Sequence, residues 1–145
     1  MPFWVSMTNS ELLKAFYSSM KESVETADRL FTTLGLLRQA GLEMDYEKTQ
    51  QLNEAVGELN VKLEEQAQSR YSISQKLGCS GARYSQQLIE RLSGETQKQV
   101  AEMAGRLESV LGDCKVRIED QVELMQRQQD SVKELIEEVA LDIKA

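Results

Sequence analysis

The chain has 145 residues, of which 41% are hydrophobic and 28% are charged, a balance typical of a folded domain and not of a disordered segment. Its formal net charge of -7 repels nucleic acid backbones and anionic membrane surfaces, and no apolar run reaches the roughly 18 residues of a membrane span. We therefore expect no nucleic acid partner and no membrane partner. The N-terminal residues lack the basic flank and apolar core of a signal peptide, so the expected location is cytoplasmic.

The inventory of reactive side chains argues against catalysis. The sequence has no histidine, and Cys79 and Cys114 are far apart, which excludes a zinc site and a Cys-His nucleophile. Paired carboxylates such as Glu64 and Glu65 fall on predicted solvent faces, and no glycine-rich loop follows a strand. We expect no enzyme, no cofactor and no metal. Both cysteines are interpreted as small hydrophobes in a reducing compartment.

The sequence predicts an all-α fold. Pro2 is the only proline, helix-forming residues dominate, and no segment alternates apolar and polar residues as a strand would. The expected architecture is an elongated antiparallel bundle of three long helices, with one short helix between the second and third. Residues 8–145 form this single domain. Residues 1–7 are expected to be a flexible leader, with Met1 and Met7 both open as the true start.

The first helix is expected over residues 9–40. Thr8 is a candidate N-cap for the backbone amide of Glu11, and Met7 is placed to pack on Leu12. Gly41 is expected to end the helix, because glycine readily adopts the left-handed conformation found there. The core-facing apolar positions are Leu13, Phe16, Met20, Val24, Ala27, Phe31 and Leu34.

The second helix is expected over residues 45–77, with Asp45 as its N-cap. Its core-facing positions are Leu52, Val56, Leu59, Leu63, Ala67, Ser74 and Leu77. Residues 78–81 read GCSG and predict the sharpest reversal of the chain. A short helix over residues 82–92 follows, and Ser93 and Gly94 are expected to break the path into the last helix.

The last helix is expected over residues 95–144. At about 1.5 Å per residue it would extend roughly 70 Å, so it should run past the ends of the other helices. Its apolar positions recur in steps of three and four: Val100, Met103, Leu107, Val110, Cys114, Ile118, Val122, Met125, Val132, Leu135, Val139 and Ile143. Gln121 and Gln128 fall on or beside this stripe, which predicts a wet groove and not a sealed core near its C-terminal end.

Two kinds of function fit a long helix with a free apolar stripe. In the first, the exposed half of the helix binds an amphipathic segment of another protein. The predicted binding residues are Val122, Met125, Val132, Leu135, Ile136 and Val139. The alternative is a structural coiled-coil or spectrin-like scaffold that self-associates through the last helix. The binding module predicts a monomer or weak homodimer, and the scaffold predicts a stable dimer.

Two segments resemble the FlgN family of flagellar type III export chaperones. In the second helix, residues 52–59 read LNEAVGEL and residues 63–66 read LEEQ, followed by Arg70 and a stop at Leu77 and Gly78. In the last helix, residues 118–123 read IEDQVE and lead into a glutamine-rich run. The resemblance implies a cytosolic helical chaperone that holds hook-filament junction proteins before secretion. It assigns client contact to the last helix and leaves docking on the export apparatus unassigned.

Overall fold

The computed structural model describes residues 8–144. It contains four helices and, within that part of the chain, no strand: α1 (Asn9–Leu42), α2 (Tyr46–Lys76), α3 (Tyr84–Arg91) and α4 (Gly94–Lys144). The predicted all-α fold, with three long helices and a short one between the second and third, is confirmed. The leader at residues 1–7 and the contact of Met7 with Leu12 lie outside the described residues.

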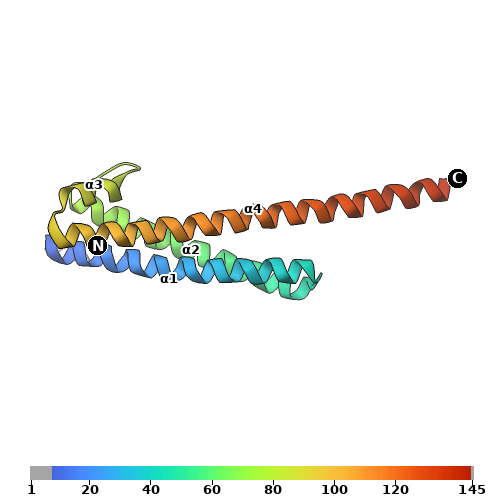
Figure 1. Cartoon of the computed structure of the whole chain (residues 1–145), viewed down its shortest axis with the longest axis horizontal. Helices are drawn as coiled ribbons and strands as arrows, with labels where there is room; N and C mark the ends of the chain where they lie inside the picture. The colour runs from blue at the N-terminus through green and yellow to red at the C-terminus, as the bar shows by residue number, and fades with distance from the viewer. Residues whose placement is uncertain (1–7, 145) are drawn as a thin grey trace.

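Successive long helices run in opposite directions along the bundle: α1 and α4 run one way and α2 runs the other (Figure 1). α1 and α2 form an antiparallel hairpin, and α4 runs beside α1 in the same direction. α3 lies at the end of the bundle where α1 begins, and it contacts both α2 and α4. As predicted, α4 extends well past the turn between α1 and α2, so its C-terminal part projects from the bundle.

Both predicted N-caps are confirmed. The backbone amide of Glu11 donates to the Thr8 hydroxyl oxygen at 3.2 Å, and the backbone amide of Lys48 donates to the Asp45 carboxylate at 3.1 Å. Gly78 and Gly81 both adopt φ +85° between α2 and α3, and Gly94 adopts φ +63° at the start of α4. The predicted breaks between the helices are therefore present. Glycine suits them, because it adopts left-handed conformations without the steric cost of a side chain.

The predicted end of the first helix is wrong. α1 continues through Gly41 to Leu42, and the left-handed residue is Met44, with φ 56°. The amide of Met44 donates to the Gly41 carbonyl at 3.1 Å, and the amide of Asp45 donates to the Ala40 carbonyl at 3.0 Å. This is the hydrogen-bond pattern of a Schellman cap displaced three residues beyond the expected position. A methionine thus occupies a conformation that glycine adopts more easily.

The apolar core forms two clusters along α1. The larger one lies at the α3 end and is centred on Phe16, Met20, Val24, Ile73, Val100 and Met103. The smaller one lies further along the bundle and contains Leu30, Leu34, Leu37 and Cys114. Leu59 packs against this second cluster but remains only partly buried, as do the other leucine positions expected to face the core from the first half of α2.

A polar network connects α1 and α2 inside the bundle. The buried α2 residues include Gln66, Arg70 and Ser74 beside Ile73. The Arg70 guanidinium donates to the Ser23 hydroxyl at 2.6 Å and to the Ser19 hydroxyl at 3.2 Å. The Ser23 hydroxyl in turn donates to the side-chain carbonyl of Gln66 at 2.8 Å. These contacts fix the register of α2 on α1 through hydrogen bonds, which need matched partners, rather than through a wholly apolar seam.

Candidate protein-binding groove at the end of the bundle

The face of α4 that packs on α1 changes from apolar to polar along the helix. Its positions recur in steps of three and four through Val100, Met103, Leu107, Val110 and Cys114, and then through Arg117, Gln121, Leu124 and Gln128. We call this set the bundle-facing seam. Gln121 is only 8% exposed, whereas Val122 beside it is 61% exposed. The seam keeps its spacing, but after Cys114 its residues are mostly polar: Arg117, Gln121 and Gln128, with Leu124 as the exception.

The apolar residues leave the bundle at the same point. They continue at Ile118, Val122, Met125, Val132, Ile136 and Val139. Gln129 occupies the position between Met125 and Val132 in the same three-and-four spacing. We call this set the outer seam. It lies one residue beyond the bundle-facing seam, and one residue corresponds to a rotation of about 100° around a helix. All six apolar members are exposed, even where α4 still runs beside α1.

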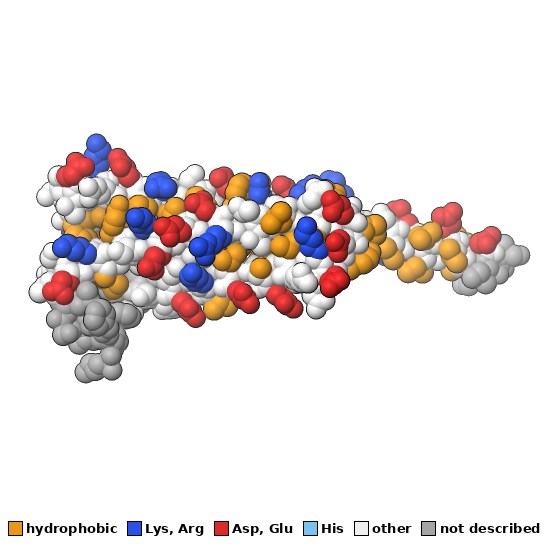
Figure 2. All heavy atoms as spheres, turned by 90° about the horizontal axis from the view of Figure 1, so that it is seen from below, with side chains coloured by type: hydrophobic (Ala, Val, Ile, Leu, Met, Phe, Trp, Pro, Cys, Tyr) orange, Lys and Arg blue, Asp and Glu red, His pale blue; other side chains and the backbone are white. Residues whose placement is uncertain are grey.

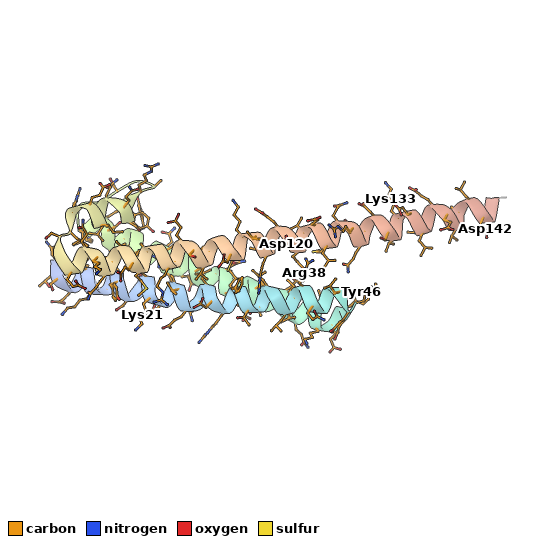
Figure 3. All side chains as sticks on the ribbon, viewed as in Figure 1. Lys21, Arg38, Tyr46, Asp120, Lys133 and Asp142 are labelled. Atoms are coloured by element: carbon orange, nitrogen blue, oxygen red, sulfur yellow. The ribbon has the colours of Figure 1, made fainter. Side chains whose placement is uncertain are left out.

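Polar contacts hold this part of α4 on α1. The Arg117 guanidinium donates to the Phe31 carbonyl at 2.6 Å, and its carbon lies 3.4 Å from the centre of the Phe31 ring. A Cβ atom on Gly35 would lie 2.5 Å from the Arg117 side chain, so this glycine leaves room for the guanidinium. Figure 3 shows Arg38 reaching toward α4, where it donates to the Asp120 carbonyl at 3.3 Å.

An open groove of about 980 Å³ lies where α4 passes the turn between α1 and α2. One wall comes from the turn and the start of α2, and the other from α4. The apolar residues on the two walls are Leu42, Met44, Tyr46, Met125, Val132 and Ile136. Figure 3 shows Tyr46 at the turn and Lys133 further along α4, and Figure 2 shows apolar side chains on the projecting part of α4.

A buried acceptor without a donor lines the groove. The side-chain carbonyl oxygen of Gln121 is inaccessible to solvent and accepts no hydrogen bond from any described residue. A buried, unpaired carbonyl costs the fold free energy. Gln128, which also lines the groove, donates to the Gly41 carbonyl at 3.0 Å.

The groove gathers three of the six predicted binding residues. Met125, Val132 and Ile136 line it, whereas Val122, Leu135 and Val139 are exposed on α4 outside its lining. Gln121 and Gln128 also line it, in keeping with the wet groove predicted there. The α1–α2 wall was not predicted, because the turn carries no periodic pattern. The only signal in the sequence was the presence of three large apolar residues, Leu42, Met44 and Tyr46, close together around one turn.

The projecting part of α4 is acidic. Residues 129–142 contain Asp130, Glu134, Glu137, Glu138 and Asp142 but only one basic residue, Lys133. Glu123 and Arg127 form an exposed ion pair one turn earlier. A helix that docks on this surface is therefore favoured electrostatically if basic residues flank its apolar face.

Residues 8–144 contain no group of three His, Cys, Asp or Glu side chains placed to hold a metal ion. Within the same range, no helix is long and apolar enough to cross a membrane.

Comparison with protein families, with curated proteins and with solved structures finds no match to this chain. The fold and the groove themselves define the class: an elongated helical bundle with an open apolar groove between a helical hairpin and a projecting helix.

Proposed function

We propose that this protein is a non-enzymatic binding protein that takes an amphipathic helix of a protein partner into the groove. The observation that supports this most directly is the groove itself, which has apolar walls on two elements and polar side chains, among them Gln128 and Gln129, between them. Such a site suits helix-in-groove recognition, in which an apolar ridge fills the groove and polar atoms fix the register.

The bundle contains an internal precedent for this arrangement. At the opposite end, α3 contacts both α2 and α4 and buries its own Leu88 in the core. The groove lies between α2 and α4 at the other end, where no described element takes the equivalent place. A helix supplied by a partner would therefore complete the bundle in the manner of α3.

Met44 provides independent support. Its positive φ costs a residue with a side chain roughly 1 kcal/mol or more, and its side chain is 59% exposed on the groove wall. Neither the backbone nor the fold gains from methionine there. A flexible thioether that contacts a bound helix gives the residue a use that offsets this cost.

The resemblance to FlgN chaperones suggests the biological setting. In this proposal the partner is a hook-filament junction protein, held in the cytoplasm in an export-competent form before flagellar type III secretion. Docking would cover the apolar face of the client helix and so limit its aggregation. Release would need no ATP hydrolysis by this chain, since its proposed role is binding alone.

Titration calorimetry with amphipathic helical segments of hook-filament junction proteins from the same organism tests the proposal. We expect binding with a negative heat-capacity change, because apolar surface is buried. Val132→Asp and Ile136→Asp should each weaken it at least about tenfold, as expected for apolar anchors in a groove. Leu141→Asp is the matched control, since Leu141 is 70% exposed and lies outside the groove. Equal affinity in all three variants would contradict the proposal.

A further inference from the structure

The outer seam has the spacing of a coiled-coil seam. From Val122 to Val139 its positions are separated by steps of three and four residues, and every position except Gln129 is apolar. A seam of this kind packs against a second helix with the same spacing. The groove shows that this seam is open, since Met125, Val132 and Ile136 line it.

The seam is complementary to itself in the antiparallel direction. If two copies of α4 lie antiparallel about a twofold axis near Asp130 and Ser131, Val122 of one copy lies opposite Val139 of the other. In the same register Met125 lies opposite Ile136, and Gln129 opposite Val132. Apolar residues therefore meet apolar residues, except where the glutamine lies nearest the axis.

The flanking positions permit the same register. In an antiparallel pair, positions on the same side of the two seams face one another. On one side this places Gln126 opposite Lys133 of the second copy, and Glu119 opposite Ala140. On the other side it places Gln128 opposite Leu135, whereas Gln121, one turn earlier, is buried against α1 and does not face the second copy. None of these pairs opposes two like charges, although the projecting helix is acidic as a whole.

The hairpin of each copy lies on one side of this arrangement. The hairpin of α1 and α2 ends beside Gln121 and Gln128 on α4, since both glutamines contact or approach Gly41. In the antiparallel register, Gln128 faces Leu135 of the second copy, in the part of α4 that projects beyond its own bundle. Each projecting helix thus lies beside the groove of the other copy. Leu135, which flanks the outer seam, would face Gln128 and the wall formed by Leu42 and Met44.

The size of the contact indicates weak association. The strip from Val122 to Val139 is about 26 Å long and about 10 Å wide, given the rise and diameter of a helix. Two such strips bury roughly 500 Å², well below the approximately 1,200 Å² of stable specific interfaces. We infer that, without a partner protein, a second copy of this chain occupies the outer seam in this antiparallel register, as a weak dimer.

Such a dimer would regulate the groove. The second copy covers the same apolar residues that the proposed function assigns to the client, so self-association and client binding exclude each other. At protein concentrations above the dissociation constant of the dimer, the apolar strip would be covered, and a client with higher affinity would displace the second copy. The inference itself does not depend on the client, because it concerns the protein alone.

Sedimentation equilibrium of the purified full chain measures the association. We expect a reversible dimer with a dissociation constant of roughly 10 µM to 1 mM, given the small contact. Val132→Asp should abolish it, because the substitution places two carboxylates near the axis. Leu141→Asp, on an exposed position outside the seam, should leave it unchanged. A wild-type chain that stays monomeric throughout this concentration range would overturn the inference.

A like-charge pair introduced between the two copies tests the antiparallel register. Gln126→Lys brings an ammonium group of each copy opposite Lys133 of the other, at two symmetric places, and should weaken the dimer about threefold to tenfold. Within one chain the same change is favourable, since Gln126 already contacts Asp130 four residues later. Adding Lys133→Glu should restore association. A dimer unaffected by Gln126→Lys would refute the antiparallel register, whatever the outcome of the client titration.

Discussion

The buried Arg70 provides the sharpest test of the energetics of the bundle. Its side chain is 7% exposed and donates only to hydroxyl and carbonyl oxygens, namely those of Ser19 and Ser23. No carboxylate pairs with it in the described contacts. Burial lowers the pKa of Arg70, and the nearby Tyr84 partly offsets this effect. The guanidinium nevertheless stays charged, so the fold bears the cost of desolvating it.

Two substitutions separate the contribution of packing from that of charge. Arg70→Ala removes two buried methylene groups, about 1.6 kcal/mol, and charge-assisted hydrogen bonds of about 1.5–3 kcal/mol, while it recovers the desolvation cost. We expect a net loss of about 2–3 kcal/mol. Arg70→Met restores apolar volume, and the Ser23 hydroxyl keeps Gln66 as its acceptor. We therefore expect Arg70→Met to cost about 1 kcal/mol or less.

Urea unfolding followed by circular dichroism at several pH values near neutrality measures both variants. The comparison requires two-state transitions with unchanged slopes, since a changed slope would indicate an altered denatured state. The prediction concerns the difference, about 1.5 kcal/mol in favour of methionine. If Arg70→Met is as destabilising as Arg70→Ala, the guanidinium stabilises the fold on balance and the desolvation argument is refuted.

Four further predictions follow from burial and backbone geometry. Phe16→Ala should lower the free energy of unfolding by about 3–5 kcal/mol, because Phe16 is fully buried. Leu59→Ala should lower it by less than about 2 kcal/mol, because Leu59 is only partly buried. Chemical unfolding measures both variants. Val139→Asp should change the free energy of unfolding by less than about 0.5 kcal/mol, and a larger loss would place Val139 in a core. Met44→Gly should stabilise the fold by about 0.5–1 kcal/mol yet weaken client binding, and a variant that binds as well as the wild type would remove the argument from Met44. Burial raises the pKa of the Cys114 thiol, so this thiol ionises at lower pH in the unfolded chain than in the folded one. The contribution of Cys114 to the free energy of unfolding should be fully present below about pH 8.5 and fall as the pH rises above it. Cys114→Ala should reduce this dependence of stability on pH.

The local features of the fold could be predicted because short-range chemistry determines them. Thr8 and Asp45 cap helices with their own side chains, and the glycines of residues 78–81 supply conformations that other residues avoid. The end of α1 could not be placed in this way. Gly41 is compatible with either a helix end or a helix interior, and the contact of Gln128 with its carbonyl, 87 residues away in sequence, was not visible.

The polar positions inside the bundle were missed because hydropathy assigns them to solvent. Gln66 and Arg70 are buried since Ser19, Ser23 and Thr26 present hydroxyl groups on the facing surface of α1. Small hydroxyl residues at spacings of four and three on one helix face are a recognisable signal. It becomes informative only when a matching set of polar residues on a second helix is considered with it.

The division of α4 into two seams explains why its apolar surface stays exposed. A rotation of α4 by about 100° would bury the outer seam against α1, but it would also turn Val100, Met103 and Cys114 out of their clusters. Twisting only the C-terminal half would bury Val122 and Met125, but would break the contacts of Arg117 with Phe31 and of Gln128 with Gly41. Neither adjustment satisfies both halves of one continuous helix. Because the sequence itself sets the two seams one residue apart, α4 cannot pack both seams on α1, and the outer seam stays exposed among the described residues.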